Sequence, residues 1–585
     1  MRTLEQVPNL VAMFFARAAE RGERPFLWHR AGGSWQATGW TEAARQVASL
    51  AAGLRALGLA PGDRVMLVGE NRPEWCISDL AIMAAGCVTV PTYVTNTERD
   101  HRHVIEDSGA SAIIVSTAKL ARTLLPAAIG TGRTIAIIGI DAMPAQADGP
   151  DVHDWRGLIA AHPAEPAECA AAASLGRGDP ACIIYTSGTG GAPRGVVQHH
   201  GAILHNLAGA GAIVIEDISG NDENVFLSIL PLSHAYEHTA GQFLPIGLGS
   251  QIYYADGLEK LAATIEEVRP TLMVVVPRLC EVLRTRIVKA IDKQGGLPAR
   301  LLASALDLGA KVDEGRLSWR DWPKRLLVGA VLKPRIAKRF GGRLNGMVCG
   351  GAPLNPEVGR FFQSLGITLL QGYGQTETGP VIACNRPAAG IAMDTVGPPL
   401  MDTEVRIADD GEILVRGELV MHGYWRNEAE TARVLRDGWL HTGDIGAFDA
   451  AGRLRITDRK KDLLVNDKGE NVAPQKVEGM LTLQPEIAQA MIAGDRRPYM
   501  VALLVPDPEW EAAHAGTDPA ARQAGLAAAV DRVNKELSVT ERVRRFILAD
   551  EPFTIANQQM TPSLKIRRHI LREVYGERLD ALYRS

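Results

Sequence analysis

Short apolar runs alternate with helical patterns along the first half of the chain, and this alternation constrains the fold more than any other feature. The runs at 63–69 and 112–115 read as strands, and 78–85 reads as a helix between them. Strands that are apolar throughout are typical of parallel sheets, because helices cover both of their faces. The sequence therefore predicts an α/β fold, with a large N-terminal domain of stacked, parallel-rich sheets and helices.

Local signals predict the bounds of several elements. Thr41 is the expected N-cap of a helix, and Gly58 supplies its stop. A strand at 271–276 is followed by a helix at 278–293. The stretch 162–180 is rich in Ala, Pro, Asp and Gly, and we expect it to be a surface loop.

The chain is long enough for several hydrophobic cores, because its 585 residues exceed what one core usually supports. Short strands at turn spacing over 394–457 predict a β-rich subdomain at the end of an N-terminal domain of residues 1–457. The charge cluster at 458–462 reads either as a hinge or as an ordinary solvated turn. As a hinge, it would join a small, mobile α+β domain of residues 463–585.

Composition argues against several classes of protein. With 46% apolar residues, 22% charged residues and a net charge of −4, the chain is expected to be globular, and no basic field points to a nucleic acid. The seven cysteines never form a CxxC pair, which favours reduced, buried thiols over disulfides or zinc. No run reaches the roughly 20 apolar residues of a membrane span, and the start lacks a signal-peptide core. We expect a cytoplasmic protein, while peripheral contact with the inner membrane face and a homodimer both stay open.

The segment Tyr185–Gly195 follows an apolar run that reads as the end of a buried strand. It combines four glycines with three Ser or Thr residues. Glycines let backbone N–H groups close around an anion, and the hydroxyls and Arg194 add donors. The segment predicts a triphosphate site, against the alternative of an ordinary Gly/Ser turn. It is neither a Walker A loop, which ends in Gly-Lys-Ser/Thr, nor a dinucleotide fingerprint, which needs a third glycine.

Residues 372–379 form a second segment that combines glycines with hydroxyl residues. Tyr373 offers a ring that can stack on a base, and Glu377 a carboxylate of the kind that holds Mg²⁺ beside phosphates. Asp444 lies in a turn and suits ribose hydroxyls, and Lys565 follows a turn that contains proline. Taken alone, each of these is also typical of an ordinary turn or a surface charge.

Taken in order, these segments resemble the adenylate-forming acyl-CoA synthetases, from about residue 30 to the C-terminus. The motifs that carry the resemblance are Tyr185–Gly195, Leu230-Pro-Leu-Ser-His234, Gly350-Gly-Ala-Pro-Leu354, Tyr373-Gly-Gln-Thr-Glu377, His441-Thr-Gly-Asp444, Asp458-Arg-Lys-Lys-Asp462 and Thr561-Pro-Ser-Leu-Lys565. Residues 230–237 and the sequence after Gly350 are most similar to the long-chain fatty acid–CoA ligases.

The resemblance implies catalytic residues and small-molecule partners. ATP, Mg²⁺, coenzyme A and a fatty acid would be the ligands. Lys565 would lie between the carboxylate and the α-phosphate during adenylation. Thr186 and Glu377 would approach Mg²⁺, Arg194 would neutralise phosphate charge, and His234 would lie between the acyl site and the thiol entrance.

The resemblance also implies which residues surround the ligands. The phosphates would lie against Thr186, Ser187, Gly188, Thr189, Gly190 and Gly191. The adenosine and the α-phosphate would lie against Gly351, Ala352, Pro353, Gln371, Gly372, Tyr373, Gly374, Gln375, Thr376, Asp444, Ile456 and Arg459. Coenzyme A would face Gly469, Glu470 and Asn471 after the C-terminal domain has turned about Lys461.

The phosphate segment departs from the family pattern at two positions. The family usually has Thr-Thr-Gly-x-Pro-Lys-Gly, so Gly190 removes a hydroxyl donor and Arg194 replaces lysine. Arginine keeps the charge and can bind phosphate through two N–H groups, but it is bulkier. We expect altered pyrophosphate release rather than lost activity.

The expected reaction is AMP-forming ligation of a carboxylic acid, a long-chain fatty acid first, to coenzyme A through an acyl-adenylate. The alternatives are an acyl-AMP ligase that transfers to a carrier protein, and a ligase for aryl or other non-fatty acids. A non-catalytic adenylate-binding or lipid-binding protein is a further alternative, although Lys565, Glu377 and Arg459 are all present.

Overall fold

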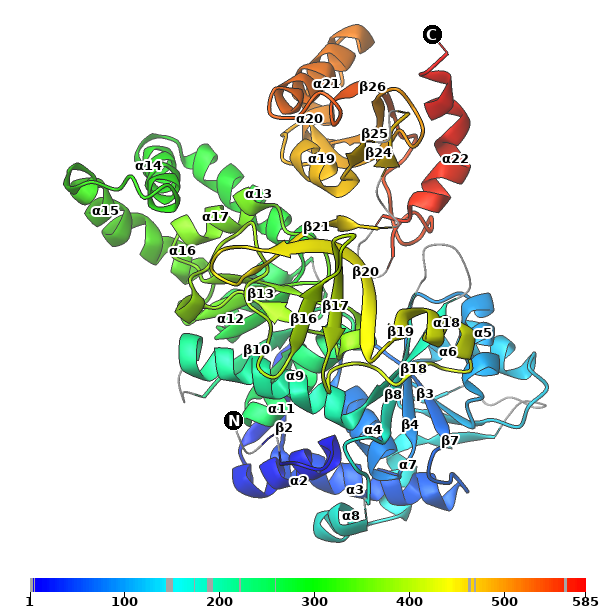
Figure 1. Ribbon diagram of the computed structural model, residues 1–585. Coiled ribbons are helices and arrows are strands. Elements are labelled where there is room, and N and C mark those ends of the chain that lie inside the picture. The colour runs from blue at the N-terminus through cyan, green and yellow to red at the C-terminus, as the bar shows by residue number, and fades with distance from the viewer. Residues whose placement is uncertain are drawn as a thin grey trace.

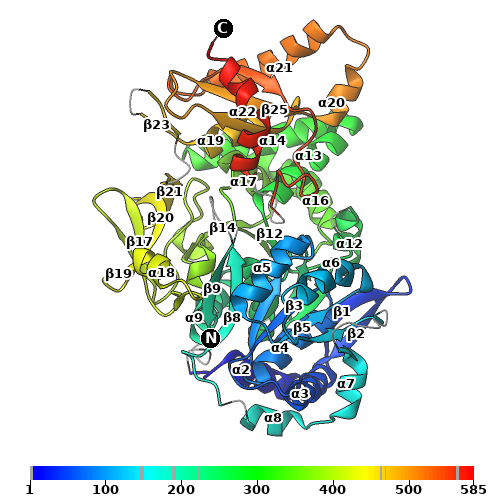
Figure 2. The same cartoon turned by 90° about the vertical axis from the view of Figure 1, so that its right-hand side faces the viewer.

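The chain folds around two eight-stranded sheets (Figure 1 and Figure 2). The computed structural model describes residues 4, 6–143, 151–172, 174–186, 193–219, 223–257, 259–460, 464–467, 470–561 and 566–584. The first sheet has the order β15-β14-β13-β12-β10-β11-β1-β2. Its strands are β1 (Pro25–Ala31), β2 (Ser34–Gly39), β10 (Val225–Ser228), β11 (Gln251–Tyr254), β12 (Leu272–Val275), β13 (Gly346–Cys349), β14 (Leu369–Tyr373) and β15 (Ala383–Cys384).

The second sheet has the order β18-β9-β8-β4-β3-β5-β6-β7. Its strands are β3 (Arg64–Val68), β4 (Val88–Thr92), β5 (Ala112–Val115), β6 (Ala136–Gly139), β7 (Val152–Asp154), β8 (Pro180–Thr186), β9 (Arg194–His199) and β18 (Gly423–Tyr424). Most neighbours in both sheets are parallel, as β10 is with β11 and β12, and β3 with β4 and β5. The prediction of an α/β fold with parallel-rich sheets is confirmed.

Two helices lie in the core that both sheets share. All residues of α4 (Pro73–Ala84) are buried, and α9 (His200–Ile213) belongs to the same hydrophobic cluster as strands β3 and β10. α9 continues into a π-helical turn, η1 (Val214–Ser219). Among the described residues, this continuous helix is the one that is long and apolar enough to cross a membrane, and 67% of its apolar window is buried. Because this helix is packed in the core, its apolar composition needs no membrane to explain it.

The other helices that pack on the two large sheets are α2 (Leu10–Arg21), α3 (Trp40–Ala56), α5 (Glu98–Ser108), α6 (Ala118–Ile129), α7 (Trp155–Ala161), α8 (Pro166–Ala172), α10 (Ala235–Glu237), η2 (His238–Phe243), α11 (Leu244–Leu248) and α12 (Leu261–Val268). All residues of η2 are buried. Helix α18 (Glu428–Val434) contacts β18, β19 (Leu435–Arg436) and β20 (Trp439–Phe448), and α20 (Pro508–Ala513) belongs to the C-terminal part.

Two local predictions are wrong. Helix α3 begins at Trp40 after Gly39, so Thr41 is not its N-cap. The stretch 162–180 contains α8 and is not wholly a loop, because its alanines are strong helix formers. All seven cysteines are buried, as expected from their apolar neighbours.

A smaller β-rich part and a C-terminal α+β part follow the two large sheets. The five-stranded sheet contains β16 (Glu404–Ile407), β17 (Glu412–Arg416), β19 (Leu435–Arg436), β20 (Trp439–Phe448) and β21 (Leu454–Arg459). The C-terminal part contains β22 (Leu464–Val465), β23 (Asn471–Val472), α19 (Pro474–Leu481), β24 (Ile487–Ala493), β25 (Met500–Pro506), α21 (Pro519–Asn534), β26 (Val543–Leu548) and α22 (Arg568–Ala581). The expected domain bounds and the hinge at 458–462 stay predictions.

A helical lobe projects beside the first sheet (Figure 1). It consists of α13 (Pro277–Gln294), α14 (Gly296–Asp313), η3 (Trp319–Asp321), α15 (Trp322–Leu327), η4 (Val328–Leu332), α16 (Lys333–Arg339) and α17 (Pro356–Ser364). Figure 1 shows α14 and α15 at the outer end of this lobe. Its first helix, α13, matches the helix expected at 278–293.

Candidate active site

A large cavity of about 2400 Å³ lies where the sheets, the β-rich part and the C-terminal part meet. Most of the residues expected to bind the nucleotide line it. These are Thr186, Arg194, His234, Gly351, Ala352, Pro353, Gln371, Gly372, Tyr373, Gly374, Gln375, Thr376, Glu377, Asp444, Ile456 and Arg459. Segments that are far apart in the sequence therefore converge on one space.

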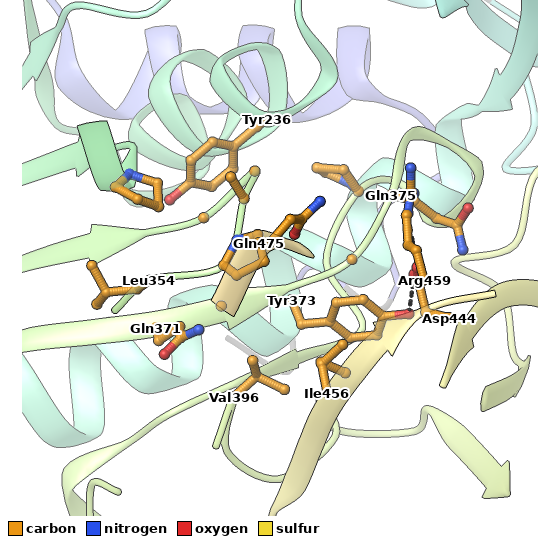
Figure 3. A pocket seen from close by; sticks show the side chains of 18 of the residues that line it. Tyr236, Leu354, Gln371, Tyr373, Gln375, Val396, Asp444, Ile456, Arg459 and Gln475 are labelled. Carbon is orange, nitrogen blue, oxygen red and sulfur yellow. Dashed lines mark hydrogen bonds and ion pairs between the residues drawn. The ribbon is translucent and has the colours of Figure 1, made fainter. Parts of the chain in front are cut away.

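A hydrogen-bonded trio occupies one wall of the cavity (Figure 3). The hydroxyl of Tyr373 donates to Oδ2 of Asp444 at 2.7 Å, and Nε of Arg459 donates to Oδ1 at 2.8 Å. Asp444 and Arg459 face each other because β20 and β21 pair in antiparallel register at these two residues. Burial is the main cause that raises the pKa of Tyr373 well above its usual value, so the hydroxyl keeps its proton. The carboxylate is therefore held by two donors.

Glycines allow the backbone to turn at the carboxyl ends of β13 and β14. A Cβ at Gly374 would lie 1.9 Å from the carbonyl oxygen of Pro380, so only glycine fits at this position. Gly351 has φ +81°, the left-handed region that favours glycine. A Cβ at Gly350 would lie 3.0 Å from the ring of Tyr236, whose hydroxyl donates to the carbonyl of Val348 at 2.8 Å.

Gln371 is a buried polar residue on the same wall. It is 8% exposed, and its Oε1 has no hydrogen-bond partner among the residues that the structure describes. Figure 3 shows it beside Tyr373, below the strand that carries both. A buried amide oxygen without a partner is costly, so this atom suits a donor on a bound molecule.

The phosphate segment joins β8 to β9. Thr186 at the end of β8 pairs in register with Arg194 at the start of β9. Ser187, Gly188, Thr189, Gly190 and Gly191 lie outside the described residues, so the expected cradle is not described.

Arg194 is held by residues that the sequence did not single out. Its guanidinium forms an ion pair with Glu430 of α18, and it lies 4.6 Å from the ring centroid of Tyr424. The hydroxyl of Tyr424 in turn donates to Oε1 of Glu377 at 2.8 Å. The cation and the carboxylate expected at the phosphates are thus linked through one tyrosine. The signal for Tyr424 and Glu430 is weak, because both lie in a segment without crowded glycines or hydroxyls.

His234 and Glu237 lie on different sides of the same short helix. His234 is the N-cap of α10, its Nδ1 accepts from the backbone N–H of Tyr236 at 3.2 Å, and it lines the cavity. Glu237 is fully buried and accepts from Oγ of Ser228 at 2.7 Å and from the backbone N–H of Ile229 at 3.2 Å. Burial raises the pKa of Glu237 to about 8, although these hydrogen bonds oppose the shift. No sequence motif marks Glu237 as a buried acid.

One end of the cavity is apolar. Lining residues recur on one face of α9 and η1 and on one face of the continuous helix α10–η2–α11, namely Ala210, Ile213, Val214, Ile218, Tyr236, Ala240 and Leu244. Phe226 and Leu272, at the amino ends of β10 and β12, also line it. Gly351 and Tyr373 lie at the opposite, carboxyl ends of strands in the same sheet. The cavity therefore extends along a strand length of roughly 10 Å.

The remaining predicted residues belong to the C-terminal part. Glu470 does not line the cavity, and its backbone N–H donates to Oδ1 of Asn466 at 2.8 Å. The side chain of Asn471 lies outside what the structure describes. Lys461, Gly469 and Lys565 lie outside the described residues. The described residues on either side of Lys565, Thr561 and Ile566, both line the cavity.

Comparison with known proteins agrees with this arrangement. A family model for the AMP-binding enzyme matches residues 14–425, and one for the AMP-binding enzyme C-terminal domain matches 461–585. The long-chain-fatty-acid–CoA ligase FadD15 of Mycobacterium bovis is 32% identical over 598 aligned residues, which cover 99% of this chain and 98% of that protein. The peroxisomal long chain acyl-CoA synthetase 7 of Arabidopsis thaliana is 31% identical, over 94% and 82% of the two chains.

Solved structures share the fold. The adenylation domain of a carboxylate reductase from Mycobacterium chelonae has a TM-score of 0.79 at 22% identity, over 100% of this chain and 93% of that one. The corresponding domain from Segniliparus rugosus, in complex with AMP and a co-purified carboxylic acid, has a TM-score of 0.78 at 22% identity, over 100% and 96%. Because the family models match both parts of the chain, it belongs to the AMP-binding enzyme family and is an adenylate-forming enzyme that activates acyl groups.

Proposed function

We propose that the protein ligates a long-chain fatty acid to coenzyme A in an ATP-dependent, AMP-forming reaction. In the first step a carboxylate oxygen bonds to the α-phosphorus of ATP, and pyrophosphate leaves. In the second step the sulfur of coenzyme A bonds to the acyl carbon, AMP leaves, and the thiol proton is released. The acyl-adenylate is the intermediate that links the two steps.

The apolar end of the cavity carries this proposal. Two helix faces and the sheet supply aliphatic and aromatic side chains there. These side chains offer few hydrogen-bond partners to a substrate acid that carries a second polar group. Each methylene buried in such surroundings contributes about 0.8 kcal/mol, so a long alkyl chain gains more than a short one. One relative is named a long-chain-fatty-acid–CoA ligase and another a long chain acyl-CoA synthetase, and both are similar over nearly the whole chain, which supports the same substrate class.

The polar wall of the cavity, which contains Tyr373, Asp444 and Arg459, supports the adenylation step. In our proposal Asp444 accepts from the ribose hydroxyls while Arg459 and Tyr373 hold it. In-line displacement at phosphorus asks mainly for positioning and charge neutralisation. Arg194 and Lys565 are the cations proposed for that task. Thr561 and Ile566, which flank the segment of Lys565 and line the cavity, support its placement.

We also propose a Mg²⁺ ion held by Thr186 and Glu377. Both residues line the cavity, and their hydroxyl and carboxylate oxygens are donors that Mg²⁺ prefers. Within the described ranges no group of three or more His, Cys, Asp or Glu side chains is arranged to hold a metal. Such a sparse donor set suits an ion bound largely through substrate phosphates, whose charge it would offset.

For the second step we propose that residues 463–585 turn about the segment 458–462. Residues on both sides of Lys565 line the cavity whereas Glu470 does not, which supports an arrangement for adenylation. A turn would exchange the segment of Lys565 for that of Gly469–Asn471 and admit coenzyme A, whose thiolate is the nucleophile. Limited proteolysis tests this, because cleavage at the hinge should change when ATP or coenzyme A binds. Cleavage that ignores both ligands contradicts the turn.

A panel of carboxylic acids, assayed with ATP, Mg²⁺ and coenzyme A, tests the proposal. We expect pyrophosphate release that depends on a long-chain acid, and thioester formation with free coenzyme A. Accumulation of acyl-AMP without thioester would favour transfer to a carrier protein. A preference for aryl acids would correct the substrate class. If no acid supports exchange of labelled pyrophosphate into ATP, the proposal is wrong.

A further inference from the structure

The outer end of the helical lobe exposes large apolar side chains. Trp319 is 82% exposed, Trp322 64%, Leu326 51% and Leu327 47%. Single exposed apolar residues are ordinary, but two tryptophans and two leucines within nine consecutive positions form a patch. We call the segment 316–327 the lobe tip.

The apolar residues of the lobe tip share one side of the helix. Trp319, Trp322 and Leu326 follow one another at spacings of three and four residues, which places neighbours on one face. Val328 and Leu332, further along the same helical run, are buried against the lobe, with 2% and 3% exposure. The exposed stripe therefore faces away from the protein.

The lobe tip is basic although the whole chain has a net charge of −4. Its cations are Arg316, Arg320, Lys324 and Arg325, and its one acid is Asp321; Lys333, Arg335, Lys338 and Arg339 follow on the helical run that leads back from the tip. Asp321 is already neutralised by Lys311 of α14 at 2.8 Å. Arg320 lies 5.7 Å from the ring centroid of Trp319, so cation and aromatic ring are adjacent. Arg316 pairs with Glu314, and Lys324 lies 3.9 Å from Asp307. Within the part of the chain that the structure describes, neither Arg325 nor Arg335 forms an ion pair.

This combination distinguishes between partners. A second copy would present the same positive charge and be repelled. A nucleic acid would use the cations but gain little from exposed leucines. Helices with tryptophan and leucine on one face and Lys or Arg beside them are typical of the interface of an anionic membrane. We propose that the lobe tip docks on an anionic lipid bilayer, with Trp319, Trp322 and Leu326 among the acyl chains and the cations on the headgroup phosphates.

The lobe connects this surface to the cavity. Pro277, Arg278 and Glu281 of α13 and Arg360 of α17 line the cavity. Nε of Arg360 also forms an ion pair with Asp313 at the end of α14, at 3.0 Å. Docking through the tip would hold the enzyme at the lipid bilayer, into which long-chain acids partition. This consequence rests on the proposed function, whereas the docking proposal does not depend on it.

Co-sedimentation with vesicles tests the docking. The wild-type protein should bind vesicles of phosphatidylcholine and phosphatidylglycerol at low salt, and should bind vesicles of phosphatidylcholine alone far less. The double variant Arg320→Glu, Arg325→Glu should lower the partition coefficient at least about 30-fold, since each lipid-facing cation contributes about 1 kcal/mol. Trp319→Ser, Trp322→Ser should also lower it and abolish the lipid-induced blue shift of tryptophan fluorescence.

Matched controls separate the tip from the rest of the surface. Lys119→Glu, Arg122→Glu changes exposed cations on α6, and Val539→Ser, Val574→Ser removes apolar residues that are 67% and 54% exposed elsewhere. Both controls should bind vesicles like the wild type. Thermal unfolding and adenylation of a short, soluble acid show that each variant is folded. The proposal is overturned if the wild type does not bind anionic vesicles, or if tip and control variants bind alike. It is equally overturned if the tip variants lose self-association or nucleic-acid binding and keep vesicle binding.

Discussion

The hydroxyl of Tyr373 donates a hydrogen bond to Asp444 at 2.7 Å, and so fixes a carboxylate that is only 3% exposed. Tyr373→Phe keeps the aromatic ring and removes this donor. Because a hydrogen bond to a charged group contributes about 1.5–3 kcal/mol, we predict that KM for ATP rises about 10- to 100-fold. Initial rates of pyrophosphate release at varied ATP measure the change. Tyr499→Phe, which removes a hydroxyl in the C-terminal part, is the control, and an equal KM in both variants contradicts the prediction.

The ion pair between Arg194 and Glu430 leads to a second prediction. If Arg194 binds phosphate, Glu430 competes with ATP for its guanidinium. Glu430→Gln removes that competition, and a partly exposed ion pair contributes about 1 kcal/mol, so KM for ATP should fall about fivefold. Isothermal titration with a non-hydrolysable ATP analogue provides an independent measure.

Two comparisons control this result. Glu428→Gln removes an exposed carboxylate of the same helix and should leave KM unchanged. In an Arg194→Ala background, Glu430→Gln should no longer lower KM, because the competition needs the guanidinium. A drop that persists without Arg194 shows that Glu430 acts on ATP by general electrostatics instead.

Much of the polar wall could be predicted from sequence because its residues come from short motifs at strand ends. Thr186 ends β8, Gly350 follows β13 and Tyr373 ends β14. The carboxyl ends of β13 and β14 meet at one edge of the first sheet, so the local signals at Gly350 and Tyr373 converge there without further information. Thr186 belongs to the second sheet, and it reaches the same cavity because the two sheets pack together. The antiparallel register of Asp444 with Arg459 then completes the wall.

The parts that could not be predicted depend on tertiary contacts. Glu430 meets Arg194 across 236 residues of sequence, and nothing local marks that pair. Glu237 reads as an ordinary helix residue until the fold buries it beside Ser228. The failed N-cap at Thr41 is a smaller case, since the N-cap is Gly39 and the helix begins two residues earlier than predicted. Local propensity loses there to the position of the preceding strand.

Ala240 provides a test of the apolar end of the cavity. It is 9% exposed and lines the cavity together with Ala210 and Ile213 of α9, so Ala240→Phe should fill space that a long chain needs. We predict that the preferred acid becomes shorter, and that activity with a C16 acid falls at least about tenfold because several methylenes of about 0.8 kcal/mol each lose their site. Rates with acids of increasing length measure the shift. Unchanged activity with a short acid is the internal control, and an unaltered length profile contradicts the channel.

Substitution of Lys565 should affect the first half-reaction and spare the second. Lys565→Ala removes the cation proposed beside the carboxylate and the α-phosphate, and we predict a fall in adenylation of about 10²- to 10³-fold, as for loss of one electrostatic stabiliser. Thioester formation from synthetic acyl-AMP should keep its wild-type rate, because that step does not use this cation. Labelled pyrophosphate exchange and thioester release are measured on the same preparation. Wild-type exchange in Lys565→Ala would show that the assigned role is wrong.

The buried carboxyl of Glu237 predicts how stability depends on pH. Burial raises its pKa from 4.5 to about 8, so between these values the folded protein keeps a proton that the unfolded chain releases. The stability that this group contributes is fully present below pH 4.5 and is lost as the pH rises through the folded-state pKa of about 8. Between these two values the free energy of unfolding falls by up to about 1.4 kcal/mol per pH unit.

Glu237→Gln has no proton to lose and should flatten this dependence. Its oxygen can still accept from Ser228, so the contacts of the folded state are largely kept. We predict that the melting temperature of Glu237→Gln, relative to wild type, increases from about pH 5 to about pH 9. Differential scanning calorimetry in matched buffers measures it, with the exposed Glu509→Gln as control. Parallel curves for wild type and Glu237→Gln would mean that Glu237 does not retain its proton across this range.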